Sequence, residues 1–218
     1  MQEEEARSFI AERYNVPRGT LAKLDQFLDL LCAHNEQQNL VSRGTLSEVW
    51  VRHILDSAQL MDWAPPTGTW ADFGTGAGFP GLVVALLHDG PVELVEERKR
   101  RVAFLTEAVA LLGIEATVRI HACKVERLDS RAFDVISARA FAPLERLLEL
   151  SHSFSTAKTR WILPKGRNAA SELEAIRASW HGEFRLEQSL TDADAKIIVA
   201  EGVRPRDPNR AAKRKGAG

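Results

Sequence analysis

Apolar residues recur at intervals of three and four along the first sixty positions of the chain, as they do on one face of an amphipathic helix. One helix is expected over 20–34, with Thr20 as its N-cap and with an apolar face of Leu21, Leu24, Phe27, Leu28 and Leu31. A second helix with the same spacing is expected over 46–62. The segment APPTGT at 64–69 then interrupts the pattern with two prolines and a glycine. We therefore predict a helical N-terminal lobe over 1–64.

From residue 70 onward, short apolar strands alternate with helices. Strands are expected near 70–73, 92–96, 116–120, 133–137, 159–164, 184–189 and 195–201. Helices are expected between them, after Pro80 and over 98–112, 144–153 and 169–180. Such alternation is typical of an α/β fold in which crossover helices connect parallel strands. The sequence predicts a seven-stranded, mostly parallel, Rossmann-like sheet in a domain over 65–203.

Charge is concentrated at the end of the chain. The formal net charge is −1, yet residues 204–218 contain six basic residues against one acidic residue. A basic, flexible tail of this kind can hold a polyanion by releasing its counterions. It is equally the composition of a solvated terminus, so the tail alone does not decide whether nucleic acid is the partner.

The composition does not favour a membrane or a metal site. The N-terminus, MQEEEARSF, has three consecutive acids where a signal peptide would be basic, and the longest apolar run, 82–87, is too short to span a bilayer. Cys32 and Cys123 lie far apart, without the spacing of a metal site, and are expected to be reduced, buried thiols. We expect a cytoplasmic protein with no membrane partner and no bound metal.

A glycine-rich loop follows the first predicted strand, in the stretch WADFGTGAGFPG at 70–81. In a doubly wound sheet this turn is where the backbone approaches the ligand. No lysine followed by Ser or Thr stands where a P-loop requires it. A dinucleotide fingerprint can be drawn through Gly76, Gly78 and Gly81, but Pro80 removes an amide from the first turn of the helix. A dehydrogenase is therefore a weaker interpretation that stays open.

The alternative register, Asp72-x-Gly74-x-Gly76-x-Gly78, resembles the first motif of S-adenosylmethionine-dependent methyltransferases. This cofactor carries a sulfonium and an ammonium group and no pyrophosphate, so an acid at the strand end suits it. A second acid is expected at the end of the next strand, where it can accept hydrogen bonds from the ribose hydroxyls. Glu96 stands there, 22 residues after Gly74. The spacing is shared with dinucleotide folds, and a non-catalytic relative of the fold also remains open.

Six segments together resemble one family, the bacterial 16S ribosomal RNA guanine-N7 methyltransferases called RsmG or GidB. In chain order, between 39 and 201, they are NLVS, VRHILDS, DFGTGAGFPG, VEERKRRVAFL, ISARAFAPL and PKGR. The resemblance implies a class I methyltransferase fold with S-adenosylmethionine as cofactor. It also implies that the cofactor contacts are Gly74, Phe79, Glu96, Val125, Glu126 and Arg139.

The same resemblance implies methyl transfer to N7 of a guanine in 16S rRNA, with guanine 527 in standard rRNA numbering as the family target. The partner would then be 16S rRNA or the small ribosomal subunit, and we expect a monomer. Guanine N7 carries a lone pair and no proton, so the reaction needs no general base. Arg139 is accordingly expected to be a positioning residue. A methyltransferase acting on another RNA or on protein, or a non-catalytic RNA-binding assembly factor, are the alternatives.

Four residues are candidates for contact with RNA. Lys165 and Arg167 follow a predicted strand end and could contact phosphates. Arg52 and His53 belong to the VRHILDS segment, which would cover the cofactor cleft. The alternative is a packed helix in which Arg52 pairs with Asp56, four residues later, while His53 faces the apolar stripe.

Overall fold

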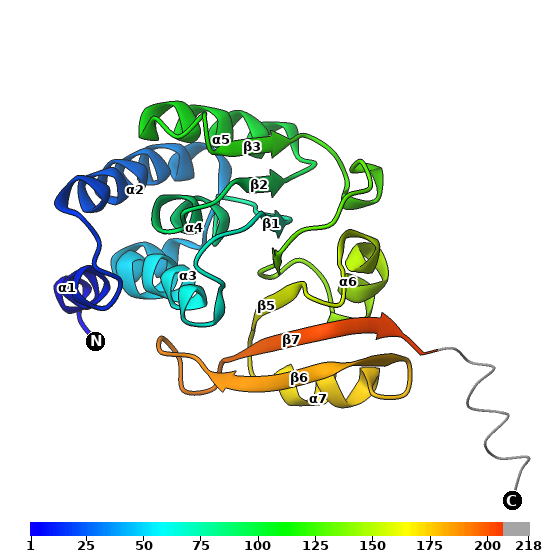
Figure 1. Ribbon diagram of the computed structural model, residues 1–218. Coiled ribbons are helices and arrows are strands. Elements are labelled where there is room, and N and C mark those ends of the chain that lie inside the picture. The colour runs from blue at the N-terminus through cyan, green and yellow to red at the C-terminus, as the bar shows by residue number, and fades with distance from the viewer. Residues whose placement is uncertain (207–218) are drawn as a thin grey trace, which may run out of the picture.

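A seven-stranded sheet organises the molecule in the computed structural model, which describes residues 1–206 (Figure 1). The strand order is β3-β2-β1-β4-β5-β7-β6. The first five of these strands are parallel, whereas β7 runs antiparallel to both β5 and β6. The strands are β1 (Trp70–Phe73), β2 (Val92–Val95), β3 (Val118–His121), β4 (Val135–Ser137), β5 (Arg160–Lys165), β6 (Trp180–Gln188) and β7 (Lys196–Pro205). The predicted fold class and the mostly parallel sheet are confirmed.

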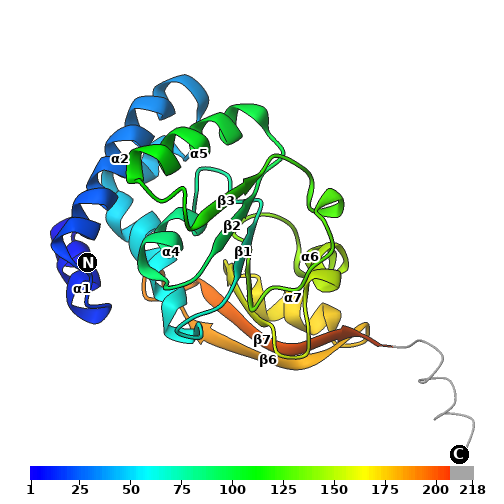
Figure 2. The ribbon, with the colours of Figure 1, turned by 45° about the horizontal axis from the view of Figure 1, so that its top comes forward.

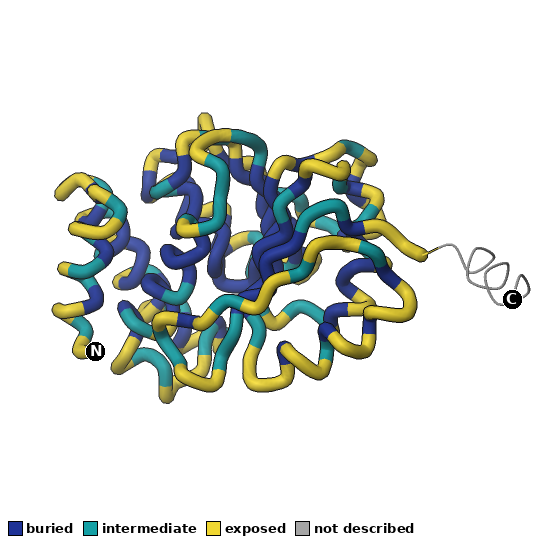
Figure 3. The backbone as a smooth tube through the Cα atoms, turned by 60° about the horizontal axis from the view of Figure 1, so that its bottom comes forward, coloured by how far each residue is buried: buried dark blue, intermediate teal, exposed yellow. Residues whose placement is uncertain are grey.

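The central strands are apolar because both of their faces are covered. Every residue of β1, β2 and β4 is buried, as the dark core of Figure 3 shows. Successive side chains point to opposite faces, so Trp70 belongs to one apolar cluster and Ala71 to the other. The strand order reverses at β1 and β4, and the crevice beyond their carboxyl ends is where such sheets bind ligands.

Helices pack on both faces of the sheet (Figures 1 and 2). The first apolar cluster joins one face to the N-terminal lobe, and the second joins the other face to the last helices. On the lobe side lie α1 (Glu3–Arg13), α2 (Arg18–Gln38), α4 (Gly81–Leu87) and α5 (Lys99–Leu112). On the other side lie η4 (Val125–Arg127), α6 (Leu144–Ser151), η5 (His152–Phe154) and α7 (Ala169–Ile176).

The N-terminal lobe shares its core with the sheet. The predicted stripe of α2 is buried, and the Phe27 ring lies 5.2 Å from that of Phe79 and 6.3 Å from that of Phe104, centroid to centroid. A single apolar cluster runs across the predicted domain boundary between 1–64 and 65–203. The division into a lobe and a domain therefore stays a prediction.

The prediction of one helix over 46–62 is wrong. This segment consists of the 3-10 helix η1 (Arg43–Glu48), the π-helix η2 (Trp50–Leu55), the short α3 (Asp56–Ala58) and the 3-10 helix η3 (Gln59–Trp63). The Ser57 hydroxyl donates to the carbonyl of His53 at 2.6 Å, and the Gln59 amide donates to that of Asp56 at 3.2 Å. These side chains compete for carbonyls that a regular helix would bond to its own amides.

Further boundaries differ from the predictions. Helix α2 begins at Arg18 with Pro17 as its N-cap, so the predicted cap, Thr20, lies inside the helix. Helix α7 ends at Ile176, and Trp180, which was expected to end the helix, begins β6 because its ring is buried against the second cluster. Strand β7 extends to Pro205, so the predicted start of the tail at 204 falls inside the sheet. The rest of the predicted tail, 207–218, lies outside the described residues.

The structure also bears on the predictions about the two cysteines and about membrane and metal sites. Cys32 is exposed and Cys123 is partly exposed, so the prediction that both thiols are buried is wrong. Neither cysteine forms a disulfide. Over residues 1–206, no helix combines the length and apolarity needed to cross a membrane, and no group of metal-ligating side chains is found.

Candidate active site

The glycine loop after β1 adopts a backbone that only glycine accommodates easily. Gly74, Gly76 and Gly78 have φ values of 69°, 62° and 90°. A Cβ atom on Gly74 would also collide with the ring of Phe141, and one on Gly78 would collide with Leu82. The loop is thus held close to its neighbours, with its bare backbone at the carboxyl edge of the sheet.

Glu96 follows β2 and reaches the loop from the neighbouring strand. Its side chain is 5% exposed, and its two carboxylate oxygens accept the backbone N–H groups of Gly76 at 3.1 Å and of Arg98 at 2.8 Å. The guanidinium of Arg101 lies 3.7 Å away. Glu96 and Gly76 of the loop, which lie 20 residues apart in the sequence, are therefore in direct contact.

A cavity of about 260 Å³ opens beside this contact. Gly74, Glu96, Val125 and Glu126 all line it, together with the Ala140–Phe141 segment that follows β4. Val125 is buried and offers an apolar wall, while the Glu96 carboxylate offers acceptors. Four of the residues predicted to contact the cofactor thus surround one cavity.

Asp72 lies beneath the loop and lines neither of the two cavities of this edge. Its carboxylate is fully buried and accepts the N–H of Gly81 at 3.0 Å and the hydroxyl of Ser137 at 2.8 Å. Burial raises the pKa of the Asp72 carboxyl, although these donors oppose the shift. In this structure Asp72 joins β1, the start of α4 and β4, which is a structural role.

Phe79 and Gly78 also lie outside the smaller cavity. Phe79 is 2% exposed, and its ring stacks on that of His53 with centroids 4.9 Å apart. The guanidinium of Arg139 lies 5.2 Å from the centre of the Phe79 ring. Phe79 thus attaches the glycine loop to the N-terminal lobe.

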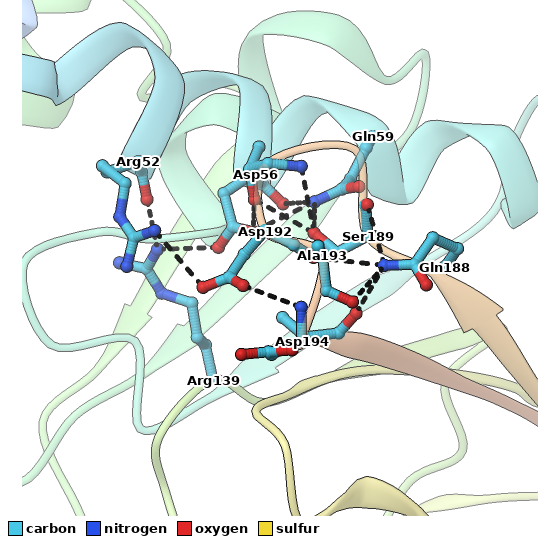
Figure 4. A network of polar contacts seen from close by, with 11 residues as sticks. Arg52, Asp56, Gln59, Arg139, Gln188, Ser189, Asp192, Ala193 and Asp194 are labelled. Atoms are coloured by element: carbon cyan, nitrogen blue, oxygen red, sulfur yellow. Dashed lines mark hydrogen bonds and ion pairs between the residues drawn. The ribbon is translucent and has the colours of Figure 1, made fainter. Parts of the chain in front are cut away.

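Arg139 lies two residues after the end of β4, and its side chain points toward the N-terminal lobe (Figure 4). One guanidinium nitrogen lies 3.2 Å from the carboxylate of Asp56, and the other donates to Nδ1 of His53, also at 3.2 Å. Since arginine only donates, Nδ1 accepts and the His53 proton resides on Nε2, 2.8 Å from the hydroxyl of Thr45. Burial, with the charges of Arg139 and Arg52, lowers the pKa of His53 to about 4. His53 is therefore neutral at physiological pH.

The predicted pairing of Arg52 with Asp56 is wrong. Arg52 pairs instead with Asp192 at 3.4 Å, and Asp56 pairs with Arg139. The π-helical turns of η2 shift residues four apart out of alignment, and the β6–β7 connection supplies a carboxylate for Arg52. The prediction that His53 faces the apolar side is confirmed, since it is 8% exposed.

The connection between β6 and β7 contacts the lobe beside Arg139 and Asp56, and the sequence analysis did not predict these contacts. Thr191 donates its hydroxyl to Asp56 at 2.9 Å, and the N–H of Leu190 donates to the Gln59 side chain at 2.8 Å. These partners lie 135 and 131 residues apart in the chain. Only Asp56 carried a sequence signal, as part of the VRHILDS segment.

A second, larger cavity of about 690 Å³ lies between the lobe, β4, β5 and the β6–β7 connection. Arg52, Asp56, Arg139 and Lys165 line it, and it shares Ala140 and Phe141 with the smaller cavity. The Lys165 side chain is 10% exposed, and its ammonium bonds to Glu172 at 2.8 Å. Arg167 is exposed and does not line the cavity.

Comparison with known proteins identifies the group to which this arrangement belongs. The family model described as GidB, rRNA small subunit methyltransferase G, matches residues 20–197. A ribosomal RNA small subunit methyltransferase G of Rhizorhabdus wittichii is 50% identical over 209 residues, covering 94% of this chain and 95% of that protein. The protein of the same name from Zymomonas mobilis is 41% identical over 215 residues, covering 94% and 96%.

Solved structures support the fold. A TehB-like S-adenosylmethionine-dependent methyltransferase of Corynebacterium glutamicum superimposes with a TM-score of 0.56 at 17% identity, covering 78% of this chain and 98% of that one. A ribosomal protein L11 methylase of Lactobacillus delbrueckii gives 0.53 at 19%, covering 70% and 77%. At these identities the likeness concerns the fold alone. Because the family model matches most of its length and the two relatives are 50% and 41% identical to it, the chain belongs to the rRNA small subunit methyltransferase G family.

Proposed function

We propose that the protein transfers a methyl group from S-adenosylmethionine to N7 of a guanine in 16S rRNA, and that guanine 527 in standard rRNA numbering is the target. One observation carries the chemistry: a cavity lined by Gly74, the first glycine of the loop, and by Glu96 adjoins a larger cavity across the shared wall of Ala140 and Phe141. Family membership supports rRNA as the substrate.

The residues at the smaller cavity fit this cofactor. A buried carboxylate beside bare backbone suits a ligand with hydroxyl groups and positive charge. Glu96 would hold the ribose hydroxyls, because each of its oxygens accepts one amide in this structure and retains a second lone pair. Gly74 would allow the ligand to approach the main chain, and Val125 with Glu126 would form the opposite wall.

The protein's contribution is to position the reactants and to exclude water. When bound, S-adenosylmethionine supplies a methyl group activated by a sulfonium. The guanine N7 lone pair can attack without prior deprotonation, so no side chain has to act as a base. Asp56 neutralises Arg139 and fixes its direction, which makes Arg139 a positioning residue at the entrance between lobe and sheet.

The RNA contacts remain proposals. Arg52, with a side chain 41% exposed, and Arg167 keep accessible guanidinium groups that could contact phosphates. His53 and Lys165 are held by partners within the protein, so we propose that they shape the RNA-facing edge without binding phosphate directly.

We also propose that the protein is a monomer acting in the cytoplasm, where its rRNA substrate is assembled. Few large apolar side chains are exposed among the described residues: Met1, Leu111, Leu186 and Leu190. Stable dimers bury a large contiguous apolar patch, so this small number favours a monomer. Light scattering coupled to gel filtration checks this, with a mass near 24.2 kDa expected.

The deciding experiment is methyl transfer from labelled S-adenosylmethionine to 16S rRNA and to small ribosomal subunits, both from cells that lack this protein. Mass spectrometry of the digested RNA locates the modified base. A single N7-methylguanosine at position 527 is expected. Methylation of another base, of another RNA or of protein contradicts the proposed target, and cofactor binding without any transfer favours a non-catalytic assembly factor.

A further inference from the structure

Phe141 lies between the two cavities. It lines both of them, and it is the one aromatic side chain among the described residues that line either. On the cofactor side its ring is packed so closely on Gly74 that a Cβ there would collide with it. On the other side it faces the larger cavity.

The backbone holds this ring in place from both directions. Arg139 is fixed to the lobe through its ion pair with Asp56. The next residue, Ala140, has a φ of 51°, a backbone conformation that residues other than glycine rarely adopt. After Phe141, the carbonyl of Ala142 accepts a hydrogen bond from Lys165 at 3.0 Å. Strained backbone that neighbouring contacts maintain is typical of functional sites.

The charges around the larger cavity are largely balanced. Three of the four cations that line it are paired with carboxylates that also line it: Arg52 with Asp192 at 3.4 Å, Arg139 with Asp56 at 3.2 Å and Lys165 with Glu172 at 2.8 Å. The fourth, Lys196, donates to the neutral side-chain oxygen of Gln188. Carboxylates therefore offset three of the four cations at this cavity, and the charge of Lys196 has no carboxylate partner in the lining.

The proposed reaction makes the ligand in this cavity positive, so the stabilisation has to come from groups other than the lining cations. The N7 lone pair forms a bond to the methyl carbon, the carbon–sulfur bond breaks, and its electron pair remains on sulfur as a neutral thioether. The positive charge passes from sulfur to the purine, with no proton transferred. An unpaired cation near the base would oppose this step, whereas an aromatic face would favour it.

We propose that the target guanine enters the larger cavity and stacks on Phe141, whose ring stabilises the positive charge that develops on the purine. This inference rests on the proposed function. A volume of about 690 Å³ is within the range of small-ligand sites, which run from about 300 to 1,000 Å³. A base taken out of an RNA stack loses its stacking partners, and an aromatic side chain replaces them.

The first test compares F141L with F141W and F141Y, which keep an aromatic face. F184L is the matched control, because Phe184 packs partly buried against the same apolar cluster but comes from β6, away from both cavities. With saturating cofactor and the RNA substrate, F141L is expected to lower the single-turnover rate on the order of tenfold. F141W, F141Y and F184L are expected to stay within about threefold of the original protein. Thermal melting of each variant shows whether it is folded.

The second test needs no turnover. The probes are 7-methylguanosine 5′-monophosphate and guanosine 5′-monophosphate, titrated into the full chain with S-adenosylhomocysteine, at slightly acidic pH where the methylated base is cationic. The protein is expected to prefer the methylated nucleotide about tenfold, F141L to lose this preference, and F141W to retain it.

Each result has a separate meaning. If F141L matches F184L both in rate and in nucleotide preference, the stacking proposal is overturned. If F141W is as slow as F141L and also lacks the preference, the ring serves packing alone, and the proposal is again overturned. If the original protein forms no N7-methylguanosine, the proposed function fails, and the nucleotide titration then decides the stacking on its own.

Discussion

Arg139 and Asp56 lie 83 residues apart in the chain and form an ion pair of 3.2 Å that joins β4 of the sheet to the N-terminal lobe. Both side chains are about four-fifths buried, at 20% and 19% exposed. The same carboxylate accepts the hydroxyl of Thr191 and the amide of Gln59, so three parts of the fold converge on it. Asp56 therefore links the lobe, the segment after β4 and the β6–β7 connection at the larger cavity.

Removing this carboxylate should destabilise the protein. D56A leaves the Arg139 guanidinium and the Thr191 hydroxyl without their partner, and we expect a loss of about 1–3 kcal/mol in the free energy of unfolding. D25N, which breaks the more exposed pair of Asp25 with Arg7, is the control and should cost at most about 1 kcal/mol. Urea denaturation measures both, and equal losses would show that the Asp56 network contributes no more than a surface ion pair.

Glu96 should determine cofactor affinity. We expect E96A to raise the dissociation constant of S-adenosylmethionine at least about tenfold, because it removes a charged acceptor worth roughly 1.5–3 kcal/mol. E115A is the control, since Glu115 is exposed and does not line the cavity. Isothermal titration calorimetry on folded variants gives the two constants, and an unchanged value for E96A would exclude Glu96 from the cofactor site.

A methyl group at Gly74 should be poorly tolerated. G74A places a Cβ against the Phe141 ring at a φ of 69°, so we expect destabilisation of at least about 1 kcal/mol and weaker cofactor binding. G44A is the control, because a Cβ there meets nothing within 4 Å. If thermal melting and calorimetry fail to separate the two variants, the close packing at Gly74 has no energetic weight.

His53 should make stability depend on pH. Its pKa is lowered to about 4 in the folded protein from an ordinary value of 6.5, so the unfolded chain binds more protons between these two values. Stability should therefore fall as pH decreases from about 6.5 to 4, by on the order of 1–3 kcal/mol from this group. H53Q should flatten the dependence in this window, while H34Q should preserve it. Urea midpoints measured from pH 4 to 7 test the difference, and parallel curves for H53Q and the original protein would refute the assignment.

The basic tail should contribute to RNA binding. Because β7 extends to Pro205 and the Arg206 side chain bonds to the carbonyl of Trp180 at 3.0 Å, the truncation should come after Arg206. This removes four basic residues and one acid. We expect weaker binding to 16S rRNA and a smaller slope of log affinity against log salt. Filter binding at several salt concentrations measures both, and an unchanged slope would mean that the tail does not contact the RNA.

The sheet and the glycine loop were predictable because their signals are local. Buried parallel strands need continuous apolar runs, and the loop between β1 and α4 needs glycine where φ is positive. Glu96 was also accessible to sequence reasoning, since strand ends in a parallel sheet meet at one edge. These features depend on residues close together in the chain or on the regular order of strands.

The partners of the lobe could not be predicted in this way. Arg52 was assigned to Asp56 on the assumption of a regular helix, but the π-helix η2 changes the spacing and Asp192 arrives from the other end of the chain. Similarly, nothing in the segment ISARAFAPL distinguishes Phe141 until the fold places it between two cavities. Contacts of this kind follow from the closure of the whole fold.

The late position of the β6–β7 connection has a consequence for how the enzyme is made. Strand β7 lies between β5 and β6 in the sheet (Figure 1). The connection that precedes it carries Leu190 and Thr191, which bond to Gln59 and Asp56 of the lobe. Because synthesis starts at the N-terminus, the glycine loop and the first five strands are made before the residues of this connection. A chain that stops before residue 189 lacks one wall of the larger cavity, and the surface proposed to receive the base stays open on that side.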